Sequence, residues 1–257
     1  MVKVIVIGSG NLAQHLIVAF QEAEQLERSI ELVQVFARHK ENLTSLIHSD
    51  KIVSNWSQLQ TADIYILAVS DDSISEVSSQ LPFNNQLVVH TSGAMPMENL
   101  DSKNRKGVFY PLQSFTKAKK VDFSRIPLCL ESENKQDYEI MEKVANTISN
   151  KVFHIESQQR QALHVAAVFV NNFTNHLYQI ASEICQENQI PFEILQPLIQ
   201  ETAHKISVIP PIQAQTGPAI RNDQKTINAH EQFLKKEEHL QLYRILTQSI
   251  QNNGKKL

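Results

Sequence analysis

The sequence predicts an α/β domain with a mostly parallel sheet, followed by a domain made only of helices. Three observations support this fold class. Short apolar runs alternate with helix-period segments from residue 2 to residue 155. The pattern Gly-x-Gly-x-x-Ala follows the first apolar run directly, and from residue 157 onward no strand-type run remains. Strands that alternate with helices and are apolar on both faces are typical of a parallel sheet covered by helices.

The first domain is expected to span residues 1–155 and to contain all the strands. Apolar or β-branched runs predict strands at 2–7, 30–36, 51–54, 62–70, 85–93, 125–132 and 151–155. Apolar residues three or four positions apart predict helices at 11–25, 42–48, 73–81 and 135–149. The stretch between them from 94 to 124 shows neither period, so we expect it to be irregular.

The second domain is expected to span residues 156–257. The pattern predicts one long helix at 157–188 and a second at 191–207, which Pro191 opens. A proline-rich loop at 208–223 follows, and then two further helices at 224–234 and 237–250. The polar tail after residue 250 is expected to fray.

Composition and charge exclude several classes of protein. A formal net charge of −3 over 257 residues gives no electrostatic reason to expect a nucleic-acid partner. No apolar run approaches the roughly 20 residues that a membrane span needs. The start MVKVIVIG has a lysine in a strand-like run and no small-residue cleavage site, so we expect no signal peptide. Cys129 and Cys185 lie in apolar periodic segments, as buried thiols of a cytoplasmic protein would.

The turn after the first strand carries the motif Gly8-Ser9-Gly10-Asn11-Leu12-Ala13. In such a motif the first glycine allows the turn, the second lets the backbone approach a pyrophosphate, and the small alanine lets helix and strand pack closely. The N–H groups that open the helix would hold the phosphates. The alternative is a tight turn that binds nothing, but its place at the start of a long strand–helix series favours a dinucleotide site.

The end of the second strand indicates which dinucleotide binds. NAD sites usually have Asp or Glu there for the ribose hydroxyls. This chain has Arg38, His39 and Lys40 instead, within VFARHKEN. A cationic tip suits a 2′-phosphate, so NADP(H) is favoured over NAD(H); the alternative is a solvated basic turn.

Two further strands end in residues that we expect near this cofactor. Val69 and Ser70 close one strand, and His90, Ser92 and Gly93 close the next. The carboxyl ends of strands in a doubly wound sheet face the ligand crevice. We therefore expect Val69 and Ser70 beside the cofactor, and the other three near the nicotinamide.

Six longer motifs extend over nearly the whole chain: VIVIGSGNLAQHL, ILAVSDDSI, VVHTSGA, GVFYPLQSF, LHVAAVFVNNFTNHL and TGPAIRNDQKTINAH. Together they resemble Rossmann-like proteins that carry the domain of unknown function DUF2520. That family belongs to the superfamily of 6-phosphogluconate dehydrogenase, ketopantoate reductase and pyrroline-5-carboxylate reductase. The resemblance implies an NADP-binding Rossmann domain, a helical domain that often dimerises, an active site between the two, and an NADP-dependent oxidoreductase activity.

The long predicted helix carries a polar stripe on an otherwise apolar segment. At 100° per residue, His164, Val168, Asn171 and Asn175 share one face, flanked by Asn172. An unpaired buried polar group costs about 1–3 kcal/mol, so this stripe needs partners. A cleft against the first domain would supply them; the alternatives are contacts across a dimer or with neighbouring backbone.

The resemblance also draws attention to a missing residue. Related dehydrogenases and ketopantoate reductases carry a lysine acid on the corresponding helix and an asparagine four residues later, where this chain has His164 and Val168. Asn172 resembles a further asparagine that contacts substrate in ketopantoate reductases. Because an imidazole suits proton donation at neutral pH, His164 is the first candidate for the acid. His90 is the second.

Two other segments offer polar groups. In TGPAIRND, Gly217-Pro218 predicts a special turn and Asp223 a helix N-cap. Arg221 is the best candidate for clamping a substrate carboxylate, because a guanidinium binds one through two hydrogen bonds; the alternative is a structural pair with Asp223. In GVFYPLQSF, Tyr110 is expected over the nicotinamide, unless this segment only connects the domains.

These features predict an NADPH-dependent reductase that passes a hydride to the C=O or C=N carbon of a small carboxylated metabolite, such as the 2-keto acid ketopantoate. Arg221 would hold the carboxylate, His164 would donate the proton, and Asn172 and Ser92 would orient the reacting oxygen. The histidines lack metal-type spacing, so no metal is expected. A homodimer through the C-terminal helices is expected. The alternatives are a non-catalytic NADP(H)-binding sensor or partner-binding protein, and an enzyme in which a deazaflavin reduces NADP.

Overall fold

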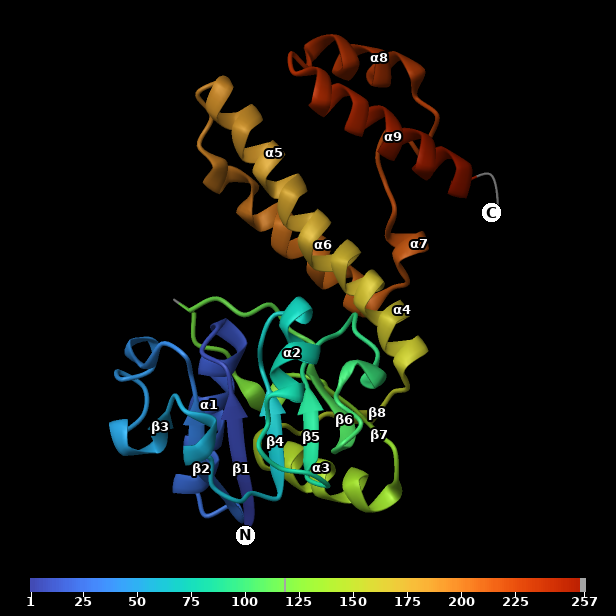
Figure 1. Cartoon of the computed structure of the whole chain (residues 1–257). Helices are drawn as coiled ribbons and strands as arrows, with labels where there is room; N and C mark the ends of the chain where they lie inside the picture. The colour runs from blue at the N-terminus through green and yellow to red at the C-terminus, as the bar shows by residue number, and fades with distance from the viewer. Residues whose placement is uncertain (118, 255–257) are drawn as a thin grey trace. The chain divides into compact units, whose positions relative to one another are not determined.

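The computed structural model describes residues 1–117 and 119–254. The chain forms two compact units, Met1–Asn172 and Phe173–Leu257. The first holds the sheet and the second is helical (Figure 1). Strands give way to helices at residues 155–157, and the first helix after this change, α4 (Ser157–Ala167), belongs to the first unit.

One sheet of eight strands lies in the described part of the chain. In chain order the strands are β1 (Val2–Ile7), β2 (Ile30–Phe36), β3 (Ile52–Val53), β4 (Ile64–Leu67), β5 (Leu87–His90), β6 (Arg105–Pro111), β7 (Leu128–Ser132) and β8 (Val152–His154). Their order across the sheet is β3-β2-β1-β4-β5-β6-β7-β8. Only the β6–β7 pair among these is antiparallel, so the predicted mostly parallel sheet is confirmed. The chain changes direction across the sheet between β1 and β4, where a crevice opens at the carboxyl ends.

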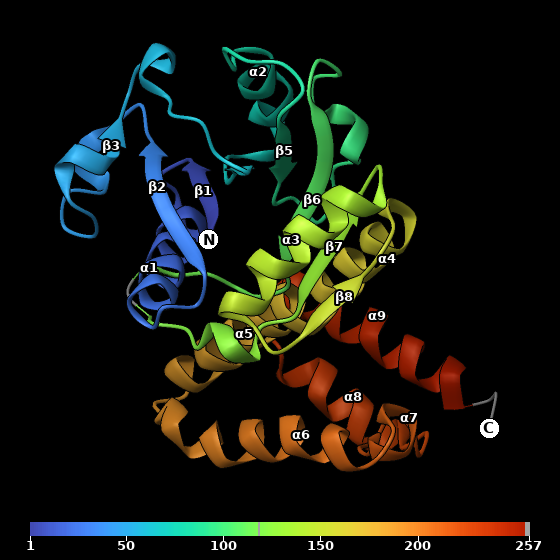
Figure 2. The ribbon, with the colours of Figure 1, turned by 90° about the horizontal axis from the view of Figure 1, so that it is seen from below.

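Helices cover both faces of this sheet. Those of the first unit are α1 (Asn11–Gln25), α2 (Ile74–Ser79), α3 (Lys135–Ile148) and α4. On one face, α1 and α3 pack with strand residues such as Val4 and Val6. On the other face, α2 packs with Ile5 and Ile7. Because β1 is buried on both sides, its sequence is a continuous apolar run. Figure 2 shows α3 lying along β6 and β7.

Two segments correct the sequence prediction. Residues 105–111, which we expected to be irregular, form β6 between β5 and β7. Gly107 and Pro111 interrupt the strand pattern there; a β-carbon at Gly107 would lie 2.8 Å from the Glu131 carbonyl oxygen, so the close pairing requires glycine. Residues 42–48, expected as a short helix, form turns that follow a single 3₁₀ turn at Lys40–Asn42. So short a segment lacks the length that sustains an α-helix without strong packing.

The long helix predicted from residue 157 is present but contains a change of geometry. Between α4 and α5 (Thr174–Glu187), residues Val168–Phe173 form a π-helical segment. The remaining helices are α6 (Gln196–Val208), α7 (Pro211–Ala214), α8 (Gln224–Phe233) and α9 (Glu237–Gly254). The short α7 lies in the predicted loop. The helix α9 continues past its expected end at 250, and residues 255–257 of the tail lie outside the described residues.

The second unit buries little apolar surface of its own. Its buried apolar residues, within the described range, are Cys185, Ala219 and Ile227. Large apolar side chains lie exposed on its helices, among them Leu198, which is 62% exposed. Cys129 and Cys185 are both buried free thiols, as predicted. Within the described residues, every helix is too short or too polar to cross a membrane.

Candidate functional site

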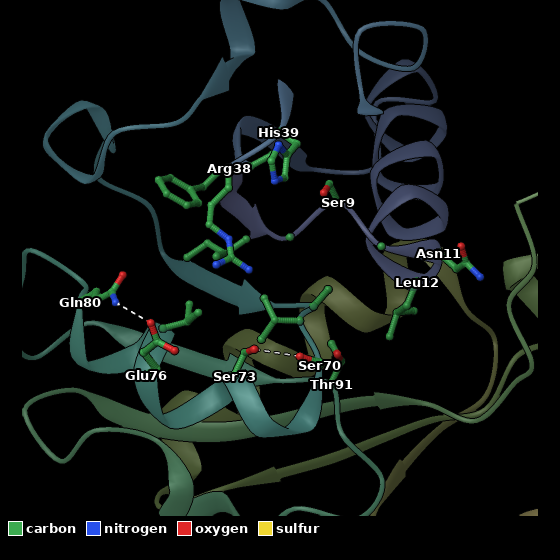
Figure 3. Close-up of a pocket in the computed structure, with 18 of the residues that line it drawn as sticks. Ser9, Asn11, Leu12, Arg38, His39, Ser70, Ser73, Glu76, Gln80 and Thr91 are labelled. Carbon is green, nitrogen blue, oxygen red and sulfur yellow. Dashed lines mark hydrogen bonds between the residues drawn. The ribbon is translucent and has the colours of Figure 1, made fainter. Parts of the chain in front are cut away.

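The first cavity opens at the carboxyl ends of β1, β2 and β4, around the glycine motif (Figure 3). Its volume is about 390 Å³. The predicted cofactor residues that line it are Gly8, Ser9, Gly10, Asn11, Leu12, Arg38, Val69 and Ser70. Three predicted residues do not line it. Ala13, the last residue of the motif, is buried, and Ser92 and Gly93 directly follow Thr91, which is a lining residue.

The two glycines of the motif have different structural roles. Gly8 has φ +138°, and a β-carbon on it would lie 2.1 Å from the Ala68 carbonyl oxygen, so any side chain would push β1 and β4 apart. A β-carbon on Gly10 would meet nothing within 4 Å, because it would project into open space. Gly10 is also the N-cap of α1, whose first turn carries no acidic residue. The free donors and the positive end of this helix suit a pyrophosphate.

The tip of β2 supplies a cation to the same cavity. Figure 3 shows the Arg38 side chain directed over the cavity. Within the described part of the chain Arg38 forms no ion pair, whereas the neighbouring Glu41 pairs with His39 at 3.3 Å. Trp56 forms part of the same wall and stacks on Phe36, with 3.6 Å between ring centroids. A free guanidinium where NAD sites carry a carboxylate fits a 2′-phosphate.

A second cavity, of about 430 Å³, lies between the segment after β6 and the helix α4 with its π-helical continuation. Half of the residues that line it are Leu, Ala and Val. The polar residues that line it are Tyr110, Gln113, Ser114, His164, Asn171 and Asn172. The structure thus brings the predicted His164 and Asn172 to one cavity, whereas Asn175 of the predicted stripe does not line it. A π-helical turn often marks a functional site, and here it presents both asparagines to the cavity.

A short loop separates the two cavities. Thr91, directly after β5, lines the first cavity. Two residues later, a β-carbon on Gly93 would lie 2.5 Å from His164 Nδ1 and 2.8 Å from Tyr110 Oη, two residues of the second cavity wall. Tyr110 Oη and His164 Nδ1 are 3.1 Å apart, within hydrogen-bond distance. The His164–Tyr110 pair therefore lies against the backbone at the carboxyl end of β5.

His90, the last residue of β5, directly precedes this loop and lines neither cavity. It is completely buried, and its Nδ1 accepts a hydrogen bond of 3.1 Å from the Ser92 N–H. Burial, with a smaller contribution from the Arg160 charge, lowers the pKa of His90 to about 4. The ring is therefore neutral at physiological pH and supports the loop, which argues against His90 as a proton donor.

Ser92 also supports the loop rather than facing a cavity. It is buried, and its Oγ accepts hydrogen bonds from the N–H groups of Ala94 at 3.1 Å and Met95 at 3.0 Å. Ser92 is not among the residues that line either cavity, whereas Asn171 and Asn172 line the second.

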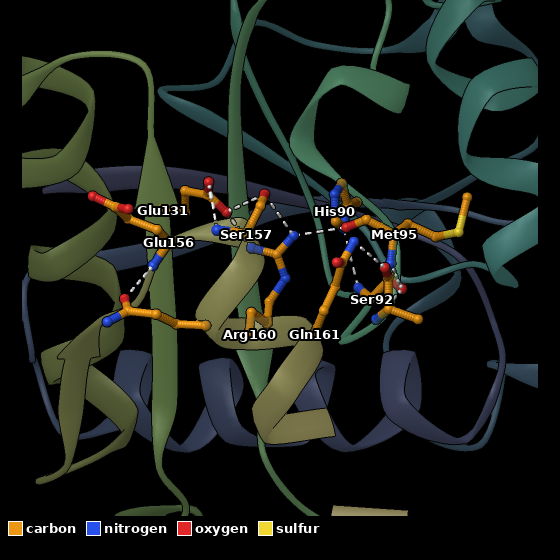
Figure 4. Close-up of polar contacts among 10 residues, drawn as sticks. His90, Ser92, Met95, Glu131, Glu156, Ser157, Arg160 and Gln161 are labelled. Carbon is orange, nitrogen blue, oxygen red and sulfur yellow. Dashed lines mark hydrogen bonds and ion pairs between the residues drawn. The ribbon is translucent and has the colours of Figure 1, made fainter. Parts of the chain in front are cut away.

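A buried ion pair that the sequence analysis missed fixes the start of α4 (Figure 4). Arg160 is completely buried and pairs with the carboxylate of Glu131 on β7. Its Nη2 donates to the Met95 carbonyl oxygen at 2.7 Å, and Glu131 also accepts from the Ser157 N–H and hydroxyl at 2.9 Å each. This network holds α4 to β7 and to the loop after β5. Arg160 precedes His164 by one helical turn, a spacing visible in the sequence, but nothing local identifies Glu131.

Arg221 belongs to the second unit, where it is exposed on the turn before α8. The special turn and the N-cap predicted there are confirmed: Gly217 has φ +107°, and Asp223 accepts a hydrogen bond of 3.1 Å from the Thr226 N–H. Hydrogen bonds from Thr226, and to a lesser degree the Arg221 charge, lower the pKa of Asp223. No lysine or arginine is among the residues that line the second cavity, all of which fall in the described part of the first unit. The carboxylate clamp at Arg221 stays a prediction.

Both halves of the chain match known families. Residues 3–93 match the family described as NADP oxidoreductase, coenzyme F420-dependent, and residues 126–250 match the domain of unknown function DUF2520. A crystal structure of a Bacteroides fragilis protein assigned as an NADP oxidoreductase is 35% identical, with 98% of each chain covered and a TM-score of 0.85. No curated protein sequence matches the chain.

More distant structures share the fold. A Thermotoga maritima protein is 20% identical, with 98% of each chain covered and a TM-score of 0.74. A pyrroline-5-carboxylate reductase from Coxiella burnetii is 15% identical, with 99% of this chain and 98% of that chain covered and a TM-score of 0.57. The Bacteroides relative, the two family matches and the glycine motif agree with one another. The chain therefore belongs to the NADP-dependent oxidoreductases that join a Rossmann domain to a DUF2520 domain, and NADP(H) is its cofactor.

Proposed function

We propose that this protein is an NADPH-dependent reductase that passes a hydride to the C=N or C=O carbon of a small carboxylated metabolite in the second cavity. The observation that carries this proposal is the short loop between the cavities. Thr91 borders the cavity with the glycine motif, and Gly93 touches His164 on the other side. A group that donates a proton thus lies close to the edge of the sheet where the nicotinamide of such enzymes binds.

The first cavity would hold the cofactor through the residues that line it. The N–H groups that open α1 would hold the pyrophosphate, with Gly10 leaving room for it, and Arg38 would bind the 2′-phosphate. Val69 and Ser70 would lie along the dinucleotide. When bound, NADPH supplies a hydride, which carries two electrons to the substrate carbon.

The second cavity would hold the substrate and supply the proton. His164 gives a proton to the nitrogen or oxygen of the reacting double bond, which yields an amine or an alcohol, and solvent then returns a proton to His164. Asn171 and Asn172 orient the double bond from the π-helical segment. Arg221 remains the candidate for holding the carboxylate.

Among substrates, we place C=N compounds first. The Coxiella structure is a pyrroline-5-carboxylate reductase, and an imine reductase from Myxococcus stipitatus, in complex with NAD⁺, has a similar fold at 16% identity and a TM-score of 0.54. Both names describe reduction of a C=N bond. The 2-keto acids come second, and no comparison favours ketopantoate in particular.

The test is NADPH oxidation against a matched panel: cyclic imines with a carboxylate, the same rings without it, and 2-keto acids. We expect turnover of a carboxylated imine, and about a 100- to 1000-fold lower kcat in His164→Ala with unchanged NADPH affinity. Arg221→Ala should raise KM only for the carboxylated substrates. Tight NADPH binding without turnover of any compound would contradict the proposal and favour a sensor.

The match of residues 3–93 to an F420-dependent family supports one second candidate, in which a reduced deazaflavin is the hydride donor and NADP⁺ the acceptor. The second cavity would then receive the deazaflavin ring. Incubation with reduced coenzyme F420 and NADP⁺ tests this directly, because NADPH formation would be visible without any added imine or keto acid.

We also propose that the protein is a homodimer through its C-terminal helices. The second unit buries few apolar residues, while side chains such as Val208, at 71% exposed, face solvent. Helices with so little core need a permanent partner, and a second copy of the chain is the partner present wherever the protein is made. Light scattering after size exclusion should give twice the mass of the chain; a stable monomer at micromolar concentration would contradict this.

A further inference from the structure

We infer that Tyr110 is a positioning residue for His164. Its hydroxyl is hydrogen-bonded to Nδ1 of the imidazole, so that Nε2 is the ring atom that delivers the proton into the second cavity. This inference rests on the proposed function, because it specifies how the proton of that reaction is handled.

Tyr110 is rigidly held, as a positioning residue must be. It lies near the end of β6, opposite Cys129 on β7, and is only 8% exposed. Its ring packs with Met97, Val108 and Cys129 in a small apolar cluster. Leu163, the residue before His164, packs against the same cluster, so the same apolar residues hold both Tyr110 and this turn of α4.

The contact between the two rings is directional. Tyr110 Oη lies 3.1 Å from His164 Nδ1, and the rings meet edge to face with centroids 6.1 Å apart. Within the described residues His164 Nε2 has no hydrogen-bond partner, and the ring borders the second cavity. One nitrogen is therefore engaged by protein and the other remains for substrate.

Tyr110 itself is not suited to supply the proton. Burial, and to a smaller extent the neighbouring Cys129, raises the pKa of Tyr110 above its usual value. Its hydroxyl therefore stays protonated through the neutral pH range. Tyr110 therefore serves as a hydrogen-bond partner of His164.

The pair reserves the Nε2 proton for substrate, because Tyr110 Oη accepts from Nδ1–H both in the protonated ring and in the neutral ring that is left after proton transfer. When the ring is protonated, Nδ1–H donates to Tyr110 Oη, and the Nε2 proton passes to the substrate nitrogen or oxygen as the hydride reaches carbon. Solvent then returns a proton to Nε2.

A double-mutant cycle tests this with Tyr110→Phe, His164→Ala and the combined variant. If Tyr110 acts through His164, Tyr110→Phe lowers kcat about 10-fold, and the combined variant equals His164→Ala. NADPH affinity and KM stay within about threefold, since the ring of Phe fills the same space. A further tenfold loss in the combined variant would show that Tyr110 acts on substrate directly and would overturn the inference. So would a kcat in Tyr110→Phe within twofold of wild type.

A spectroscopic test does not depend on turnover. With ¹⁵N-labelled histidine, the Nδ1 resonance of His164 should carry the shift of a hydrogen-bonded nitrogen and lose it in Tyr110→Phe. His230, whose Nδ1 is 2.9 Å from Tyr243 Oη, is the internal reference and should not change. Tyr138→Phe is the matched control, because Tyr138 meets His154 edge-on at 5.3 Å in the same unit.

The spectroscopic test and the kinetic test can give different outcomes, which separates the inference about Tyr110 from the proposed reaction. An unchanged His164 Nδ1 resonance in Tyr110→Phe would overturn the inference, whatever the enzyme reduces. Conversely, if no panel compound is reduced but the resonance moves as expected, the pairing stands and only the proposed reaction is refuted.

Discussion

The backbone of Gly93 lies directly against the imidazole of His164, because a β-carbon at residue 93 would be 2.5 Å from His164 Nδ1. Gly93 comes from the loop after β5, and His164 comes from α4. This contact joins the helix that carries the candidate proton donor to the sheet edge that carries the glycine motif. It also explains why a glycine stands here, although the loop needs no positive φ at this position.

Gly93→Ala should therefore damage catalysis more than cofactor binding. The added methyl group would displace His164 and Tyr110, whose Oη would be 2.8 Å from it. A displacement of about 1 Å at a reacting group can lower the rate about 100-fold, so we expect a 10- to 100-fold lower kcat. NADPH affinity, measured by fluorescence titration, should stay within about threefold. An unchanged kcat would mean that the contact is not part of the working geometry.

Arg38→Ala should remove the preference for NADPH over NADH. Loss of charge-assisted hydrogen bonds to the 2′-phosphate should weaken NADPH binding about 10- to 100-fold and leave NADH binding nearly unchanged. Lys40→Ala is the matched control, because Lys40 carries the same charge on the same turn but does not line the cavity. Calorimetric titration of both variants with both cofactors checks this, and an equal loss for NADPH and NADH would contradict it.

Arg160→Met should strongly destabilise the first unit. It leaves the Glu131 carboxylate, 12% exposed, without its buried partner. Breaking one side of such a pair typically costs about 3–5 kcal/mol of unfolding free energy. Lys120→Met is the control, because its pair with Glu22 is exposed and its loss should leave the urea midpoint unchanged. If both variants unfold at the wild-type midpoint, the Arg160 network does not stabilise the fold.

The parts of the fold that the sequence predicted are those with local signals. The strand–helix alternation, the turn at Gly8 and the N-cap at Asp223 are each encoded within a few neighbouring residues. The strand β6 was missed because Gly107 and Pro111 interrupt its pattern, and the requirement for glycine there comes from a carbonyl oxygen on β7. A local pattern cannot register a constraint set by a distant strand.

In the candidate site too, the residues that a local pattern encodes could be predicted, and those brought together by distant segments could not. The motif residues around Gly8 share one cavity because they share one turn. A helical wheel at 100° per residue selects Asn171, flanked by Asn172, and both line the second cavity. It also selects Asn175, which lies beyond the π-helical segment Val168–Phe173 and does not line the cavity. The pairing of Arg160 with Glu131 joins a helix to a strand, and only the folded chain brings them together.

The buried His90 should make the fold less stable in mild acid. Its burial, with the Arg160 charge, lowers its pKa from 6.5 to about 4 in the folded chain. Between these values the unfolded chain binds a proton at this histidine and the folded chain does not. The free energy of unfolding should therefore fall as pH drops through this window, by about 1.4 kcal/mol per pH unit and up to about 3 kcal/mol in all.

Urea unfolding at several pH values within this window measures the effect. His90→Asn keeps an acceptor for the Ser92 N–H but cannot take up the proton, so its unfolding free energy should fall less steeply in acid than that of wild type. His48→Asn is the control: its ring is 84% exposed, and its pH dependence should follow wild type. Parallel curves for wild type and His90→Asn would mean that the acid sensitivity of the fold comes from other groups, because a histidine with the same proton affinity in both states contributes no slope.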